Sequence, residues 1–264
     1  MFMNNHLKEF QKLNASNQSI FDADLLIILK DGTNLTSWSD VDNDQDILYL
    51  SEDLSDFNDL KGRYKNLRSL KAIVASNVSN EVTSLDEMFM NCHSLAGVCT
   101  MNSWDVSNVG SMSSMFFECG SLGDVSFMDG WNVSNVKNMK SLFDYCFSLG
   151  NISALANWDV SSVENMSYMF DDCHSLDDVS SLKDWNVSNV RDMSWMFSCC
   201  NYLHDISALK DWDVSNVKDM SYMFEGCDYL SDASALTDWN FSNVEDSNSM
   251  FLNSGVKDLF SKLI

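Results

Sequence analysis

The sequence repeats itself with a period of 27 residues. A tryptophan marks the same position in six successive units, with no insertion or deletion between them: Trp104, Trp131, Trp158, Trp185, Trp212 and Trp239. A motif that recurs at a fixed period owes most of its residues to packing between units. The period therefore constrains the chain to a stack of similar coils, each in contact mainly with its neighbours.

Other apolar residues keep the register of the tryptophans, so that each unit reads approximately W-[DN]-V-S-N-V-x-x-M-x-x-M-F-x-x-C-x-S-L. The first unit has Asn77 in place of tryptophan, and the last unit departs from the pattern in several columns, as capping units do. We divide the chain into an N-terminal capping region, residues 1–76, and an array of about seven units, residues 77–264, which ends in a decayed cap.

The local pattern within one unit, residues 203–229, fits neither a period of 2 nor one of 3.6. We predict a short strand at "LHDISAL", a polar turn at "DWDVSN", a second extended piece at "VKDM" and one or two helical turns at "SYMFEGC". Copies of the strand would stack in parallel at about 4.8 Å from unit to unit. The tryptophan, valine, methionine, phenylalanine and cysteine columns would then fill the interior.

This repeat resembles that of the BspA-like leucine-rich-repeat surface proteins, over roughly residues 77–251. The resemblance implies a leucine-rich-repeat-like solenoid that takes part in adhesion or host interaction, with a protein or cell-surface macromolecule as its partner. Combined with the local patterns, it predicts an α+β repeat solenoid made of short parallel strands and short helical turns behind an N-terminal cap.

The ends of the chain lack the repeat. We predict a short amphipathic helix at "HLKEFQKL", residues 6–13, and a strand followed by a turn at Asp31–Gly32 within residues 23–38. A further strand is expected at "DILYLS", residues 46–51, and a short helix at "VKDLFSKLI", residues 256–264. These segments would cover the apolar ends of the stack.

The net charge of −23 is concentrated in the array, where residues 77–264 carry 27 acids and 8 bases. This excess of acids disfavours direct nucleic-acid binding and binding to anionic membrane surfaces, because both require basic residues. No run of apolar residues is long enough for a membrane span. The first residues do not form a basic segment followed by an apolar core, so we predict no secretory signal there. The resemblance implies the cell surface or secretion, whereas the missing signal favours the cytoplasm.

Cysteine and acidic residues are the candidate metal ligands in this sequence. Six of the eight cysteines share one column, and we interpret them as free, buried side chains, although the spacing of successive coils also permits a disulfide. A column forms a line, whereas zinc needs ligands that converge. The segment "DVDNDQD", residues 40–46, resembles the start of a calcium loop but lacks its glycine and its final glutamate, so we interpret it as a solvated acidic loop. We predict no metal and no cofactor.

Catalysis is not predicted. The sequence places no histidine distinctively beside a serine or cysteine nucleophile, and it contains no glycine-rich phosphate loop. The remaining candidates are columns that the repeat leaves variable. One column contains three successive aromatic residues, Tyr168, Trp195 and Tyr222, which would bind a partner or pack over the turns beneath them. Another contains Asp178, Asp205 and Asp232, which would form a solvated face or a surface for a basic partner.

The sequence is compatible with three functions. We favour a non-enzymatic binding protein of the adhesion type, which follows from the resemblance and the aromatic column. The first alternative is an intracellular acidic decoy that imitates nucleic acid and occupies a basic protein. The second alternative is a structural scaffold. The aromatic column disfavours this last reading, because interface anchors are commonly Tyr and Trp.

Overall fold

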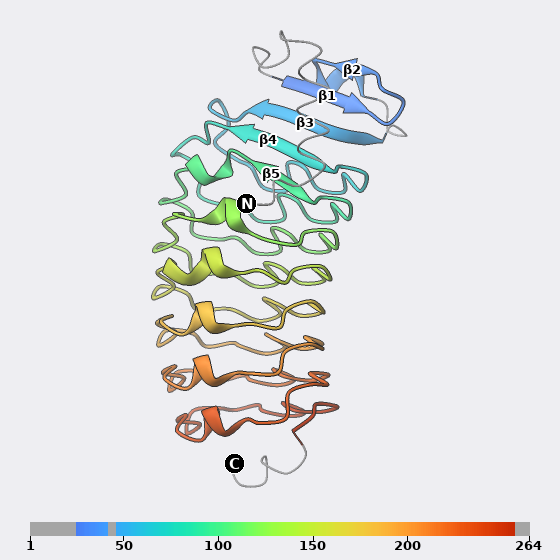
Figure 1. Ribbon diagram of the computed structural model, residues 1–264. Coiled ribbons are helices and arrows are strands. Elements are labelled where there is room, and N and C mark those ends of the chain that lie inside the picture. The colour runs from blue at the N-terminus through green and yellow to red at the C-terminus, as the bar shows by residue number, and fades with distance from the viewer. Residues whose placement is uncertain (1–24, 42–45, 257–264) are drawn as a thin grey trace.

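The computed structural model describes residues 25–41 and 46–256, which form a stack of coils extending from a mixed sheet at the N-terminal end (Figure 1). The predicted helix at 6–13, nearly all of the predicted helix at 256–264 and the middle of the acidic loop lie outside the described residues. Within those residues no helix is both long enough and apolar enough to cross a membrane.

The sheet has five strands in the order β2-β1-β3-β4-β5. Strand β1 pairs antiparallel with β2 and β3, while β3, β4 and β5 run parallel. The strand bounds are β1 Leu25–Leu29, β2 Asn34–Leu35, β3 Ile47–Asp53, β4 Ala72–Ser76 and β5 Gly97–Cys99. The two predicted strands and the turn at Asp31–Gly32 are confirmed, with Gly32 at φ +89°.

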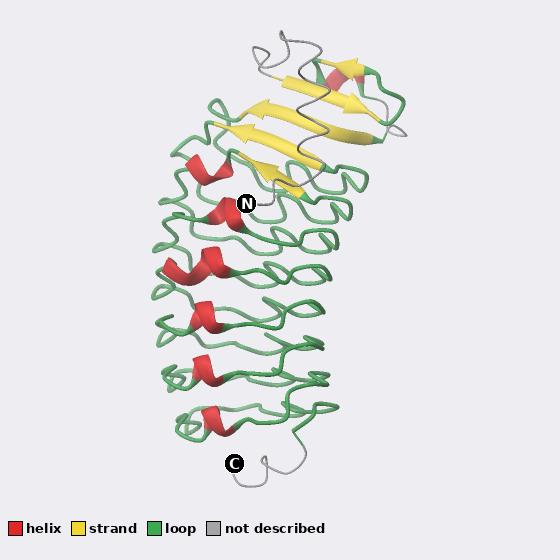
Figure 2. Ribbon diagram, viewed as in Figure 1, coloured by secondary structure: helices red, strands yellow, loops and turns green. Residues whose placement is uncertain are grey.

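Beyond β5 the described chain contains no further strand, and the coils are joined by isolated parallel bridges such as Asn138–Asn165 and Asn165–Asp192. Six successive coils each have one short 3₁₀ helix on the same side of the stack (Figure 2). These helices are η3 Met101–Ser103, η4 Ser126–Met128, η5 Ser153–Asn157, η6 Ser180–Leu182, η7 Ser207–Leu209 and η8 Ser234–Leu236; another, η2 Trp38–Asp40, follows β2.

Two predicted elements are wrong. The strand at "LHDISAL" is η7, preceded by a single bridge residue, Asp205. It fails to extend because the Asp205 carboxylate accepts the N–H of Ser207 at 2.7 Å and bends the backbone. The helical turns at "SYMFEGC" are a series of tight turns. Tyr222 and Gly226 lie in the left-handed region, at φ +59° and +67°, which interrupts any helix. The described residues therefore contain 3₁₀ turns but no α-helix.

Side chains connect each coil to the next. The phenylalanine column stacks ring on ring, with centroids 5.2 Å apart at Phe89–Phe116 and 5.6 Å apart at Phe170–Phe197. Indole N–H groups donate to a carbonyl one coil earlier, as Trp185 does to Leu155 at 3.0 Å. These columns are buried, as the repeat predicts.

The cysteine column is free and buried at every described member, which confirms the sequence interpretation. Each thiol points at the backbone of an earlier coil; the Cys119 Sγ donates to the Phe89 carbonyl at 3.2 Å. Burial raises the pKa of these thiols, that of Cys92 to about 12. The polar turn at "DVSN" is also confirmed, because Asn216 donates its amide to the Ser188 carbonyl of the preceding coil at 2.7 Å.

Candidate functional site

The three predicted aromatic residues form one continuous stack, which we call the aromatic ladder: Tyr168, Trp195 and Tyr222. Ring centroids are 5.7 Å apart between Tyr168 and Trp195, and 4.1 Å apart between Trp195 and Tyr222, with interplanar angles of 6° and 14°. All three side chains are half-buried. The ammonium group of Lys140, from the preceding coil, lies 5.6 Å from the ring centre of Tyr168. The ladder therefore presents its ring edges to solvent while the ring faces contact one another.

The backbone under the ladder is fixed by the fold. Each ladder residue has φ near +60°, and the same column is left-handed where it holds serine, at Ser114 and Ser141. The N–H of every ladder residue donates to the next coil, as Trp195 does to Ser221 at 2.9 Å. The left-handed geometry is therefore a property of the coil, which the aromatic residues inherit. Serine at this position is compatible with the same backbone.

Buried acids lie beside the ladder. Asp144 and Asp171 are 4% and 6% exposed, and the Oδ1 atom of each has no hydrogen-bond partner in the described structure. Burial, strengthened by the charge of Asp171, raises the pKa of Asp144 to about 8. Burial likewise raises the pKa of Asp171 to about 7. Burial and the charge of Asp171 also raise the pKa of Tyr168, so these acids lie within electrostatic reach of the ladder.

The predicted acidic column has a structural role that the sequence did not reveal. Asp178, Asp205 and Asp232 are exposed, and each carboxylate accepts the N–H of the serine two residues later, at 2.7 to 2.8 Å. These bonds begin the 3₁₀ helices of their coils and hold the pKa of Asp205 and Asp232 below the usual range. Asp178 and Asp205 line a shallow pocket of about 280 Å³ together with His204. The column is thus both a turn element and an exposed anionic face.

Sequence reasoning missed the most exposed aromatic pair. Tyr202 and Tyr229 are 57% and 62% exposed, and their rings stack at 5.7 Å. Both replace the serine of the C-x-S-L segment, so a comparison of that column between units would have found them. A second chain of ring contacts links Tyr145, Phe147 and His174, with centroid distances of 5.8 and 5.1 Å.

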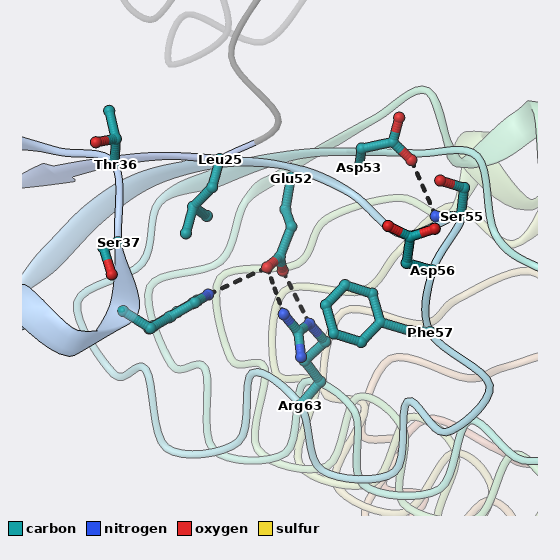
Figure 3. A pocket seen from close by; sticks show the side chains of 10 residues that line it. Leu25, Thr36, Ser37, Glu52, Asp53, Ser55, Asp56, Phe57 and Arg63 are labelled. Atoms are coloured by element: carbon teal, nitrogen blue, oxygen red, sulfur yellow. Dashed lines mark hydrogen bonds and ion pairs between the residues drawn. The ribbon is translucent and has the colours of Figure 1, made fainter.

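A cavity in the N-terminal region offers a different kind of site. It measures about 550 Å³ and lies between the β2–η2 segment, the end of β3 and the chain that follows it (Figure 3). The Glu52 carboxylate is its buried charge, and it receives both the Arg63 guanidinium and the Trp38 indole N–H, the latter at 3.1 Å. The Tyr64 hydroxyl donates to the same carboxylate at 2.6 Å. Because these donors come from the protein itself, the polar centre of the cavity is already satisfied.

Comparison with family models gives two overlapping matches, over residues 58–154 and 150–260, to a family described as "Mycoplasma protein of unknown function, DUF285". The chain belongs to the DUF285 family. The matched residues include the aromatic ladder, the buried acids and the exposed acidic column. Among curated proteins, none matches this chain.

Several solved structures of leucine-rich repeat proteins are similar to this DUF285 chain. One from Eubacterium ventriosum is 11% identical with a TM-score of 0.39, and the match covers 81% of this chain and 79% of that one. One from Bacteroides ovatus is 16% identical with a TM-score of 0.40, over 88% and 68% of the two chains. A leucine-rich cell surface protein from Faecalibacterium prausnitzii is 15% identical with a TM-score of 0.22, over 82% and 81%.

Proposed function

We propose that this protein is a non-enzymatic interaction protein whose partner binds along the aromatic ladder. In this proposal the chain is a leucine-rich-repeat-like solenoid, residues 77–264, behind a capping region, residues 1–76. In keeping with its BspA-like repeat, the partner would be a protein or other macromolecule at a cell surface. Binding would be of the adhesion type.

The stacking of the ladder carries this proposal. Aromatic residues anchor interfaces because they bury a large area at a low cost in side-chain entropy. The rings of Tyr168, Trp195 and Tyr222 are already ordered against one another, so a partner would not have to immobilise them. The half-buried acids Asp192 and Asp219, which lie near Tyr168, would favour a partner that carries basic groups.

The non-enzymatic part of the proposal rests on the state of the nucleophiles. A cysteine nucleophile acts as a thiolate, and thiolates form where the pKa is lowered. In this chain burial raises the pKa of the column thiols, as at Cys92, and that of Cys199 is raised to about 11. These thiols are therefore protonated near neutral pH and are weak nucleophiles.

A triple variant, Y168S/W195S/Y222S, tests the ladder. Serine occupies the same left-handed column at Ser114 and Ser141, so the backbone should be retained. We expect capture of the surface partner from intact cells to be lost while the Tm stays within a few degrees of the wild type. Y202S/Y229S is the matched control, because it removes an exposed stacked pair from another column. A large loss of Tm with retained capture would show instead that the ladder serves packing.

Surface display is tested separately. Intact native cells are treated with a protease, and the chain is followed by immunoblot together with a cytosolic protein. We expect the chain to be degraded while the cytosolic protein is spared. Protection of both proteins until lysis would contradict a role in adhesion at the cell surface.

The exposed acids support a second candidate, an acidic decoy for a basic protein. Asp178, Asp205 and Asp232 point to solvent from successive coils, and the lowered pKa of Asp205 and Asp232 keeps those two ionised. Binding through exposed charges weakens steeply with salt, whereas binding through aromatic anchors does not. Partner affinity measured at low and high salt therefore distinguishes the two. D178N/D205N/D232N would abolish decoy binding, and asparagine preserves the turn, as Asn151 does in the same column.

A further inference from the structure

Three side chains from two adjacent coils converge beside the buried acids. One oxygen each from Asp171 and Asp172 and the Sγ of Cys199 all lie within 4.8 Å of one another. Cys199 lies outside the buried cysteine column and is partly exposed. Its Sγ is also 3.5 Å from the Oε2 atom of Glu225, which comes from the following coil. Four potential ligands thus come from three successive coils.

The carboxylate of Asp171 lacks a partner at one of its atoms. Asp171 is only 6% exposed, and its Oδ1 has no hydrogen-bond partner among the described residues. A buried carboxylate oxygen without a donor is costly, and such groups usually bind a proton, a cation or a metal. Among the described residues, no lysine or arginine forms a salt bridge with Asp171, Asp172 or Glu225. His174 is the base that contacts the cluster, through Asp172, whereas Asp171 and Glu225 form no salt bridge among the described residues.

The sequence leaves space beside the thiol. Gly226 stands in a left-handed column that holds Tyr145, Asp172 and Cys199 in the preceding coils. A Cβ atom at Gly226 would lie 3.2 Å from the Cys199 Sγ, which is closer than such contacts normally are. A larger residue would therefore crowd the thiol.

We propose that Asp171, Asp172, Cys199 and Glu225 form a binding site for a thiophilic divalent cation such as Zn²⁺. Zinc is bound by four sulfur, nitrogen and oxygen ligands at about 2.0–2.3 Å, so the four side chains would have to rotate inward to bind it. His174 supports one ligand, since its Nε2 lies 3.0 Å from the Asp172 Oδ1 and would orient that carboxylate. A cation would provide Asp171 with the partner it lacks.

Binding would displace protons from the site. The thiol must lose its proton to become a ligand, so zinc binding is coupled to proton release.

Calorimetric titration of the reduced full chain with Zn²⁺ tests the site, and Cd²⁺ titration detects the metal–thiolate bond by its ultraviolet charge-transfer band. We expect one ion per chain and the appearance of the band. Cys199→Ser should abolish the band, and Cys199→Ser or Asp171→Asn should weaken Zn²⁺ binding by at least about 10-fold. Cys200→Ser and Asp178→Asn are matched controls, because they change a neighbouring thiol and an acid of the exposed column, and both should bind as the wild type does.

Two results would overturn the proposal. One is Zn²⁺ binding that is equally strong in the wild type and in Cys199→Ser. The other is displacement of Zn²⁺ by Mg²⁺ or Ca²⁺ at equal concentration, because hard cations prefer oxygen ligands and would indicate diffuse binding to acids. The far-ultraviolet circular dichroism and the Tm of each variant show that its fold is retained. These outcomes do not depend on whether the aromatic ladder binds a partner.

Discussion

The N-terminal sheet and the coil array differ in how neighbouring segments of the chain are bonded to one another. In the sheet, the backbone of β3 pairs directly with that of β1 on one side and that of β4 on the other, over five residues in each case. In the array the strands shrink to single bridges, and backbone bonds made from turns, such as that of the Trp195 N–H to Ser221, are joined by side-chain bonds between coils. Indole, thiol and amide groups there donate to carbonyls of the preceding coil. A strictly periodic sequence therefore does not require long regular secondary structure, provided that each unit carries its own donors.

The two regions also differ in the partners of their buried carboxyl groups. In the N-terminal region Glu52 is neutralised by Arg63 and bonded by Trp38 and Tyr64. In the array, no described base forms a salt bridge with the buried carboxyls of Asp144 and Asp171, and one oxygen of each lacks a hydrogen-bond partner. The first arrangement stabilises an ion pair, whereas the second favours protonated carboxyls. Each difference has a measurable consequence.

The largest expected effect is a loss of stability when the buried phenylalanine column of the array is interrupted. Phe170 is fully buried and stacks on Phe143 and Phe197. We expect Phe170→Ala to lower the free energy of unfolding by about 3–5 kcal/mol, because it leaves a cavity between two rings. Leu50→Ala in β3 should cost about 2–5 kcal/mol. Urea denaturation monitored by circular dichroism measures both. A cost below about 1 kcal/mol at Phe170 would contradict the proposed importance of the stack.

A similar loss is expected at the buried ion pair. Arg63→Met leaves the Glu52 carboxylate buried without its base, which costs about 3–5 kcal/mol. The double variant Glu52→Gln with Arg63→Met should recover much of this loss, because no buried charge remains. Lys30→Met is the control, since its pair with Asp46 is exposed and such pairs contribute at most about 1 kcal/mol. Equal losses at Arg63 and Lys30 would show that burial does not matter here.

A smaller effect should appear in the pH dependence of the array. The pKa of Asp144 is about 8 in the folded chain, above its ordinary value of 3.8. Between about pH 4 and pH 8 the unfolded chain therefore loses this proton first, and stability falls as the pH rises. Asp144→Asn removes this loss. We expect its Tm to exceed that of the wild type by roughly 4 °C or more at pH 9, since 1 kcal/mol shifts Tm by about 2–4 °C in a chain of this size.

The control for that measurement is pH 4, where the wild-type carboxyl is protonated in the folded chain and the two proteins should differ little. Asp205 is the opposite case, because hydrogen bonds from Ser207 lower its pKa. Any stabilisation that Asp205→Asn removes is therefore one that the wild type loses as the pH falls. A Tm difference between wild type and Asp144→Asn that is the same at pH 4 and pH 9 would contradict the raised pKa.

The smallest expected effect separates packing from hydrogen bonding in the tryptophan column. Trp185 donates its indole N–H to the Leu155 carbonyl at 3.0 Å, whereas the Trp158 N–H has no partner. Both side chains are buried. Replacement by phenylalanine removes similar volume at both sites, so Trp185→Phe should cost about 1 kcal/mol more than Trp158→Phe. Equal costs in urea denaturation would show that the inter-coil indole bonds add nothing to packing.

Much of the fold follows from the columns. The buried tryptophan, phenylalanine and cysteine columns, the polar turn and the two N-terminal strands were all predicted, since each depends on pattern and residue type. The strand at "LHDISAL" and the helix at "SYMFEGC" were predicted wrongly. In both, local bonds and left-handed residues override the apolar spacing, as Asp205 and Tyr222 show.

The candidate site was predicted only in part. The aromatic column was visible because three successive units differ from the serine of the others, and the structure brings those rings into contact. Tyr202 and Tyr229 were missed, although their column shows a similar change. The cluster of Asp171, Asp172 and Cys199 combines residues from two columns, and columns compared one at a time do not reveal it.

The sequence by itself determined the period, the composition of the interior and the pairing of each residue with its copy in the next coil. These follow from spacing, because equal spacing places equivalent side chains in line. Only the tertiary structure decided which variable columns lie beside one another, which rings are exposed and which carboxylates are buried. Those properties depend on how the backbone turns within one coil, and single hydrogen bonds such as that of Asp205 to Ser207 set the turn.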